Sequence, residues 1–512
     1  MFNFTIYFSE PSKNSYYLSI IIVIFIILLI IQLIIMLIKK LRNDSRDDLS
    51  PSLKYYFIKL KIYYLLAFIL SRSAMWAQAP YLFILFKTAH KYSNEKINIL
   101  YLVESISSLI FGPISGLLAD VTGRASVWIL YNISLFLYLY NILMGFVYFG
   151  QIANGFGNEV INTTFEAWVV SDTNDVIISY TKGVERFRKK LFKNANILDA
   201  TVNIFITGIC SIIYSYLEKY SPYLGICAIF FISYWLSFVS LHVIIARWHE
   251  NRISLIYHFE EAFDELMEIN VLCIGLIENI ALINLNIFLF SWASILKQST
   301  EKEINIGYIY TCMVLTMIIG TKLYEILIIY CNFNYYMSIT GCFFIQGLLL
   351  YKTYFDNRFL ERLIYLSLFN GLIGFYNPLN SIVKSNILIE KYRALLMNLF
   401  RTPYNIYVII SLFTLKHINP LKLIFFAGHL SFIAFGIGVF LCIYLYIHPE
   451  NNIPKEVQFL YTIKNNNYIY SEEDNNNNDN DLIKPKKHIY SGEDDMLKNL
   501  KQKTHIYIEE DE

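Results

Sequence analysis

The chain has 512 residues, of which 56% are hydrophobic, 17% aromatic and only 16% charged. This composition is too apolar for a water-soluble protein of that length. The formal net charge is +1, so no overall basic field points to a nucleic acid partner. Composition therefore indicates a membrane protein.

Long apolar stretches recur along the chain, which is typical of helices that span a bilayer. The first, near 16–38, is too long for a signal-peptide core and no A-x-A cleavage site follows it, so we expect it to remain as an anchor. Further spans are predicted near 61–86, 97–119, 126–148, 149–171, 194–217, 222–246, 269–295, 304–330, 334–354, 359–383, 396–415 and 421–447. The prediction is an all-α polytopic membrane protein, with one extra N-terminal transmembrane helix before two sets of six.

Lysine and arginine residues orient these spans, because they are enriched on the cytosolic side of a membrane. They cluster from Lys39 to Lys61, which places this segment in the cytosol and the N-terminus outside. Lys87, Lys91 and Lys96 fall on the opposite side and depart from the rule. The predicted divisions are an extracellular or lumenal N-terminus (1–15), the extra helix (16–38), a cytosolic linker (39–60), a first six-helix bundle (61–246), a cytosolic inter-bundle linker (247–268), a second six-helix bundle (269–447) and a disordered cytosolic tail (448–512).

The tail is rich in asparagine and charge and poor in apolar residues, which is typical of disorder. Three related units recur in it, NYIYSEED, KHIYSGEDD and THIYIEEDE. The recurrence of these units has two interpretations. One is random drift of a low-complexity sequence, and the other is a motif by which the tail docks cytosolic proteins. Both interpretations stay open.

Motifs of enzymes and metal sites do not occur in the sequence. No G-x-x-x-x-G-K-[ST] loop is present, so transport would depend on an ion gradient or on none. H-E-x-x-H and G-x-S-x-G are also missing. The seven cysteines lie in apolar segments and form no C-x-x-C pair. We therefore expect no catalytic residue, no metal ligand and no cofactor.

A loop motif carries a resemblance to a known superfamily. The segment from Gly116 to Arg124 reads G-L-L-A-D-V-T-G-R between the second and third core spans. It resembles the G-x-x-x-D-x-x-G-R signature of major facilitator transporters. Ala125 departs from the family, which usually has another basic residue there. The resemblance implies a multi-pass protein with the major facilitator fold, two six-helix bundles that rock about a central cavity.

Further motifs narrow the resemblance to the molybdate-anion transporter family within that superfamily. Residues 76–82 resemble its W-x-Q-A-P-Y-L, residues 165–168 its F-E-A-W, and residues 398–403 its N-x-F-R-x-P. This resemblance implies a secondary or facilitative transporter of molybdate or a related small oxyanion, in the plasma membrane or in an organelle membrane. Relatives have an acid at the position of Met75 and an arginine at that of Gln151. These departures keep open a transporter of an organic solute, such as a sugar or an amine. A non-transporting receptor or scaffold is a further alternative, against which the intact loop motif argues.

Ionisable residues within the spans are candidates for substrate contact, because a charge at the bilayer centre costs at least about 2.5–3.5 kcal/mol. Arg72 and Glu104 are expected at similar depth on adjacent helices, where they form either a structural ion pair or an anion contact with its counter-charge. Glu159 is a candidate for carrying a coupled proton or for helix packing. The candidate substrate-binding residues are Arg72, Gln78, Glu104, Glu159, Glu278 and Asn377.

A second group is assigned to gating by the resemblance, because the loop closes the cytosolic side in the superfamily. Asp120 is expected to accept hydrogen bonds from the N-terminus of the eleventh core helix, around Leu396–Asn398, where free amides and the helix dipole favour an anion. Arg124 is expected to pair with Glu166. The candidate gating residues are Gly116, Asp120, Gly123, Arg124 and Glu166.

Overall fold

The computed structural model describes residues 51–245, 258–300, 306–414 and 419–448, together with Leu28, Ile31 and Gln32. Within these residues all regular structure is helical. The first bundle contains α2 (Pro51–Ile84), the π-helical turn η1 (Leu85–Ala89), α3 (Asn94–Thr122), α4 (Arg124–Leu143), α5 (Val147–Leu217) and α6 (Pro222–Ile245). After the short α7 (His258–Met267), the second contains α8 (Ile269–Gln298), α9 (Ile306–Tyr324), η2 (Glu325–Tyr330), α10 (Tyr335–Phe355), α11 (Phe359–Ile387), η3 (Glu390–Tyr392), α12 (Arg393–Thr414) and α13 (Pro420–Ile447).

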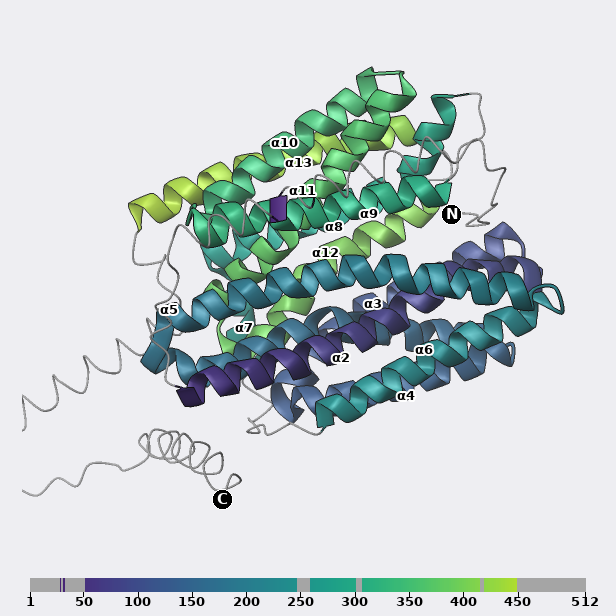
Figure 1. Ribbon diagram of the computed structural model, residues 1–512, viewed down its shortest axis with the longest axis horizontal. Coiled ribbons are helices and arrows are strands. Elements are labelled where there is room, and N and C mark those ends of the chain that lie inside the picture. Colours follow the sequence, from purple (N-terminus) through teal and green to yellow (C-terminus); the bar gives the residue numbers. More distant parts are fainter. Residues whose placement is uncertain are drawn as a thin grey trace, which may run out of the picture.

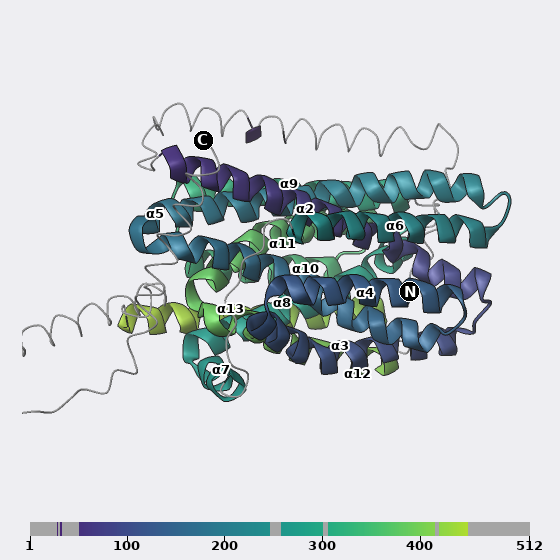
Figure 2. The same cartoon turned by 90° about the horizontal axis from the view of Figure 1, so that it is seen from below.

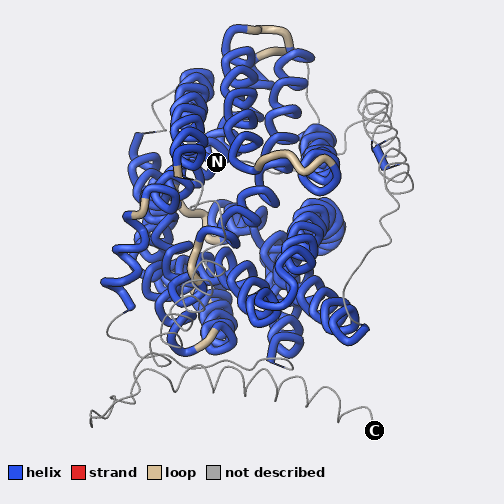
Figure 3. The backbone as a smooth tube through the Cα atoms, turned by 90° about the vertical axis from the view of Figure 1, so that its left-hand side faces the viewer, coloured by secondary structure: helices blue, strands red, loops and turns tan. Residues whose placement is uncertain are grey.

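The two bundles lie side by side with their helices running in roughly the same direction. In Figure 1 the first bundle, coloured purple to teal, forms the lower half, and the second, green to yellow, forms the upper half. Figure 2 shows α7 at the edge of the molecule, beneath the end of the bundles where α5 turns. The end-on view in Figure 3 shows the helices packed around one another with loops only at their ends.

The 71 residues of α5 form two arms that run in opposite directions. The guanidinium of Arg188 donates to the carbonyl of Val170 (3.0 Å) and to Thr173 Oγ1 (2.7 Å). A straight helix advances about 22 Å over the 15 residues from Thr173 to Arg188, so the chain must reverse between them. The two arms supply the fourth and fifth helices of the first bundle, as the spans predicted near 149–171 and 194–217 require.

Several helices are long and apolar enough to cross a membrane. By length and composition these are the segments Glu95–Thr122, Gly183–Leu217, Tyr223–Ile244, Ile269–Gln298, Gly307–Tyr330 and Pro420–Ile447. Side chains such as Ile212 and Phe231 are exposed on the outside of the bundles, which is the arrangement expected of a surface that faces lipid.

The boundaries of some predicted segments differ from the structure. α2 begins at Pro51 and so extends into the segment 39–60 that was expected to be a linker. Within 247–268, α7 forms the expected short helix from His258. Of the expected anchor at 16–38 only three residues are described: Leu28 packs against Cys312 and Leu315, and Gln32 accepts a hydrogen bond from Lys322 Nζ at 2.9 Å. The segments 1–15 and 449–512 lie outside the described residues.

Small residues allow α9 and α11 to approach closely. A Cβ atom added at Gly320 would lie 1.7 Å from the carbonyl oxygen of Gly371, and one at Gly374 would lie 2.0 Å from that of Met317. Because these are backbone atoms, no side-chain rotation can relieve the clash. Such small-residue contacts are a common way to pack helices in membranes, where the hydrophobic effect does not hold helices together.

We predict that Gly320→Ala destabilises the protein by about 1–3 kcal/mol, because the added methyl group must push α9 away from α11. The melting temperature of the purified protein should fall. The matched control is Gly341→Ala in α10, where an added Cβ atom meets nothing within 4 Å, so the melting temperature should stay the same or rise slightly. Equal melting temperatures for the two variants would contradict this packing.

Candidate functional site

Many of the described polar contacts between the two bundles lie toward one end of the helices, which we call the latch end and define by Asp120, Lys384 and Arg393. Farther along α5, Asn203 Nδ2 also donates to Tyr310 Oη of α9 at 2.8 Å. Asp120, in the last turn of α3, accepts hydrogen bonds from the backbone amides of Ala394 (3.1 Å) and Leu395 (2.8 Å). These amides belong to the first turn of α12, so they have no carbonyl partner within the helix. The helix dipole also favours a carboxylate at the N-terminus of a helix. The cap lies slightly earlier than the expected Leu396–Asn398, because α12 begins at Arg393.

Two glycines of the loop motif occupy positions that require glycine, each for a different structural reason. A Cβ atom at Gly116 would lie 2.6 Å from the carbonyl oxygen of Ala394 and 2.7 Å from Asn398 Nδ2, so α3 can meet α12 only through a glycine. Gly123 has a φ of +96° and separates α3 from α4. L-residues rarely adopt this conformation, so glycine allows the tight turn between the two helices.

A buried ionic cluster lies beside this cap. Lys384 Nζ of α11 is 3.3 Å from Glu166 Oε2 of α5 and 3.1 Å from Glu278 Oε1 of α8. The Lys384 side chain is only 5% exposed, and Ser381 Oγ donates to Glu166 Oε2 at 3.1 Å. The side chain of Arg124, the expected partner of Glu166, is outside the described set. In the described part of the chain, the charge opposite Glu166 is Lys384, and it belongs to the other bundle.

A second cross-bundle link joins α5 to the π-helical turn after α9. Lys193 Nζ is 2.9 Å from Glu325 Oε1, and Glu325 Oε2 is 3.4 Å from Lys322 Nζ. One turn along α5, Asn196 Nδ2 donates to Thr321 Oγ1 at 2.6 Å, and Asn196 Oδ1 accepts from Asn377 Nδ2 at 3.3 Å. Asn377 therefore takes part in contact between the bundles.

A third link lies farther from the latch end. Glu159 of α5 is 2% exposed, and its Oε2 is 3.0 Å from Arg401 Nε of α12. Its other oxygen accepts from Asn405 Nδ2 at 3.2 Å. Arg401 is the ninth of the 22 residues of α12, about 12 Å along that helix. A carboxylate of the first bundle is thus neutralised by an arginine of the second.

Arg72 and Glu104, which were expected at similar depth, have different partners. Arg72 Nε lies 3.8 Å from Asp199 Oδ1, which also accepts a hydrogen bond from Trp76 Nε1 at 2.9 Å. Glu104 Oε1 accepts from Asn154 Nδ2 (2.9 Å) and from Asn158 Nδ2. The expectation of an Arg72–Glu104 pair is wrong, because the two arms of α5 supply a partner to each.

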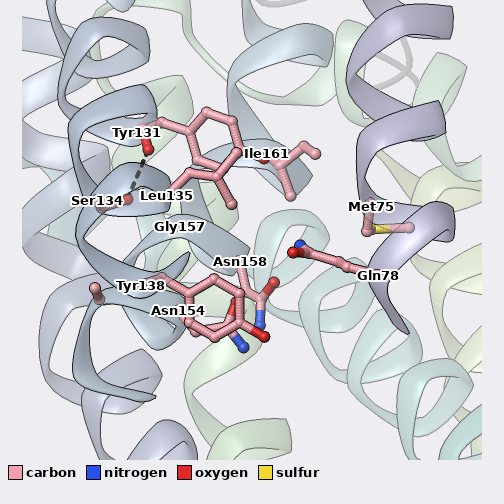
Figure 4. Close-up of a pocket in the computed structure, with 11 residues that line it drawn as sticks. Met75, Gln78, Tyr131, Ser134, Leu135, Tyr138, Asn154, Gly157, Asn158 and Ile161 are labelled. Atoms are coloured by element: carbon pink, nitrogen blue, oxygen red, sulfur yellow. Dashed lines mark hydrogen bonds between the residues drawn. The ribbon is translucent and has the colours of Figure 1, made fainter. Parts of the chain in front are cut away.

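Gln78 lies in a small pocket inside the first bundle, between α2, α4 and α5. Figure 4 shows its side chain pointing toward Asn158, and Gln78 Oε1 is buried without a hydrogen-bond partner among the described contacts. The pocket measures about 10 Å³, which is room for about one water. Its lining consists of Met75, Gln78, Tyr131, Ser134, Leu135, Tyr138, Ala153, Asn154, Gly157, Asn158 and Ile161.

The structure therefore sorts the predicted residues into two groups. Glu159 and Asn377 contact the other bundle, as do the candidate gating residues Asp120 and Glu166, and Glu278 joins the same cluster through Lys384. Arg72, Gln78 and Glu104 make their described contacts within the first bundle. Sequence reasoning missed Lys193, Glu325, Lys384 and Arg401 as charges of the junction. All lie in or next to predicted spans, so a complete census of charges there would have found them.

Comparisons with known proteins identify the family. A family of sugar transporters with 12 transmembrane helices, in the major facilitator superfamily, matches residues 21–355. The chain belongs to this family. This is a family of multi-pass membrane transporters and not of enzymes.

Curated relatives and solved structures agree with this assignment. The molybdate-anion transporter of Danio rerio is 28% identical over 123 residues, which are 23% of this chain and 25% of the relative. That of Takifugu rubripes is 32% identical over 117 residues, 22% of this chain and 24% of the relative. The chain thus matches about a quarter of the length of these relatives. The matches confirm the resemblance to molybdate-anion transporters.

Solved structures show the fold. FucP, the E. coli fucose:proton symporter, in its outward conformation has a TM-score of 0.59 at 12% identity, covering 75% of this chain and 99% of that protein. An outward-facing bacterial homologue of the iron transporter ferroportin has a TM-score of 0.58 at 16% identity, with coverage of 75% and 99%. The human organic anion transporter MFSD10 has a TM-score of 0.55 at 12% identity, with coverage of 76% and 100%.

We predict that Lys384→Met lowers the stability of the purified protein by about 3–5 kcal/mol, because Glu166 and Glu278 then remain buried without a counter-charge. Adding Glu166→Gln and Glu278→Gln to the same chain should recover most of the loss in thermal melting. The control is Lys391→Met, which removes a lysine that is 41% exposed and 2.7 Å from Glu261 and should cost less than about 1 kcal/mol. Equal losses for the two lysine variants would contradict the buried cluster.

Proposed function

We propose that this protein moves molybdate or a related small oxyanion across a membrane by alternating access. The observation that carries the mechanism is the gathering of cross-bundle contacts toward the latch end, from the Asp120 cap to the Lys384 cluster and the Lys193–Glu325 pair. These contacts exist only while the bundles touch there. Rocking the bundles apart at that end would break them together and would open a path from the latch end.

The orientation proposed for the transporter places the latch end in the cytosol. The lysines and arginines that follow the first predicted span support this, because Lys54, Lys59 and Lys61 lie in α2 near its latch end. On this orientation the described conformation is closed toward the cytosol. The transported solute would then enter from the other side.

The substrate class is proposed from the relatives, both of which are named molybdate-anion transporters. A neutral organic solute such as a sugar is the second candidate. The description of the family supports it. The two candidates differ in charge, so uptake measurements separate them.

We predict that liposomes containing the purified protein take up labelled molybdate or sulfate faster than empty liposomes, and that excess unlabelled L-fucose does not compete. Uptake of a labelled sugar with no uptake of either anion would favour the second candidate. Absence of uptake of every solute tested, by protein whose fold is verified by its melting transition, would contradict transport.

A further prediction concerns the latch. Asp120→Asn should slow uptake several-fold or more, because it weakens a contact that exists only in the state in which the latch end is closed. A differential interaction of about 1–3 kcal/mol changes the ratio of two conformational states by about 5- to 150-fold. The matched control is Asp264→Asn, the same change at an exposed position of α7, which should leave uptake unchanged.

Accessibility of the latch gives a second readout. In a chain whose exposed Cys331 is first replaced by serine, a cysteine introduced at Asn377 should react faster with a membrane-impermeant maleimide when Asp120→Asn is also present. Normal uptake together with unchanged reactivity would show that the loop does not gate this protein.

A further inference from the structure

Arg401 is a charged side chain that lies between the two bundles and has hydrogen-bond donors to spare. Its Nε is 3.0 Å from Glu159 Oε2, while Nη1 and Nη2 make no hydrogen bond to any residue that the structure describes. The Arg401 side chain is 15% exposed, against 2% for Glu159. The Nη1–Nη2 edge of the Arg401 guanidinium is therefore not used by the ion pair. This edge presents paired N–H donors, a geometry that suits carboxylates and oxyanions.

Tyr404, three residues farther along α12, lies next to Arg401 and carries a hydroxyl. Its ring centroid lies 5.8 Å from Arg401 Cζ. Asn286 Nδ2 of α8 donates to Tyr404 Oη at 3.5 Å, and Asn279 Oδ1, also on α8, accepts from the Tyr404 amide at 2.9 Å. Because the hydroxyl oxygen accepts from Asn286, its own proton remains available to a ligand. The two α8 amides hold this part of α12 in place.

Glu159 has the properties of an internal substitute for an anion. It comes from the other bundle and offers two oxygens, of which one contacts Arg401 and the other contacts Asn405. A buried arginine needs a counter-charge in an empty site. An oxyanion that binds the guanidinium edge would compete with this carboxylate for the same charge.

We propose that Arg401 and Tyr404 bind the transported solute, a small tetrahedral oxyanion, and that Glu159 neutralises Arg401 when the site is empty. This assignment rests on the proposed function. It moves the anion contact from Arg72 of α2 to Arg401 of α12. Arg72 is 3.8 Å from Asp199 within one bundle, so rocking of the bundles leaves that pair together, whereas the Arg401–Glu159 pair joins the two bundles.

The test measures equilibrium binding of labelled molybdate to the full-length protein in nanodiscs. Arg401→Lys should raise the dissociation constant about tenfold, because an ammonium cannot make paired contacts from one plane. Tyr404→Phe should raise it about fivefold through the lost hydrogen bond. The matched control is Tyr407→Phe, which removes a hydroxyl from the next turn of the same helix, where the ring packs against a hydrophobic cluster; its dissociation constant should equal that of the wild type.

Glu159→Gln separates competition from a purely structural ion pair. If Glu159 competes with the anion, this variant should bind molybdate about fivefold more tightly than the wild type. It should also melt at a lower temperature in chloride buffer and regain stability when molybdate is added, by a larger shift than the wild type shows. Should the variant fold poorly in chloride, purification in molybdate should restore its yield, and chloride at equal ionic strength should not.

Three results would overturn the assignment. The Arg401–Glu159 pair would be structural only if the Glu159→Gln variant bound molybdate as weakly as Arg401→Lys does. The same would follow if molybdate left the melting temperature and the yield of the Glu159→Gln variant unchanged. Wild-type binding that persists unchanged in the Arg401 and Tyr404 variants would place the anion elsewhere and leave the proposed function intact. Wild-type protein that binds neither molybdate nor sulfate would contradict the oxyanion function itself, and this site with it.

Discussion

An ionised side chain inside a bilayer must find its partner within the protein, because hydrocarbon offers neither water nor counter-ions. For three charges of the first bundle, that constraint is met across the junction of the two bundles. Glu159, Glu166 and Lys193 of the first bundle each contact an opposite charge of the second, at 3.0, 3.3 and 2.9 Å. Satisfying these charges and closing one end of the molecule are therefore the same event.

The cost of separating the bundles is distributed unevenly between them. Lys384 keeps Glu278, and Glu325 keeps Lys322, because each of these pairs lies within the second bundle. Among the described ion pairs, Glu159 and Glu166 have their partners only in the second bundle, and Arg401 has its partner only in the first. Opening the latch end would thus leave unpaired carboxylates on the first bundle, where water entering from the newly opened side can solvate them. A buried pair broken in this way costs several kcal/mol unless water or a ligand replaces the partner.

The contact of Asp120 with the start of α12 agrees with the sequence prediction, and part of the signal for it is local. Gly116, Asp120 and Gly123 stand at fixed spacing at the end of one helix, so their position relative to a loop follows from the chain itself. The partner helix of Asp120 was predicted from the superfamily resemblance, and the contacts of Ala394 and Leu395 with that carboxylate agree with it. The two sets of six helices followed from apolar stretches, except that helix ends shifted, as at Pro51.

The ion pairs between distant helices could not be predicted from the sequence in the same way. Depth along a helix does not give the direction in which a side chain points, because each residue turns about 100° around the axis. Arg72 and Glu104 were matched by depth alone, whereas the partner of Arg72 is 127 positions away on the second arm of α5, at Asp199. Arg401 stands inside the N-x-F-R-x-P motif of residues 398–403, so the sequence indicated the family resemblance at this position and not a charge that pairs with the other bundle.

The central claim is that cross-bundle contacts hold the latch end closed and that weakening them lets the bundles rock open at that end. Double electron–electron resonance between spin labels measures this directly, with one pair at the exposed Arg186 and Asn334 of the latch end and another at the exposed Tyr220 and Asn357 of the opposite end. In Asp120→Asn we predict a population with a longer distance for the first pair and a shorter distance for the second. Distance distributions that stay the same in both pairs, or that lengthen in both, would contradict the account.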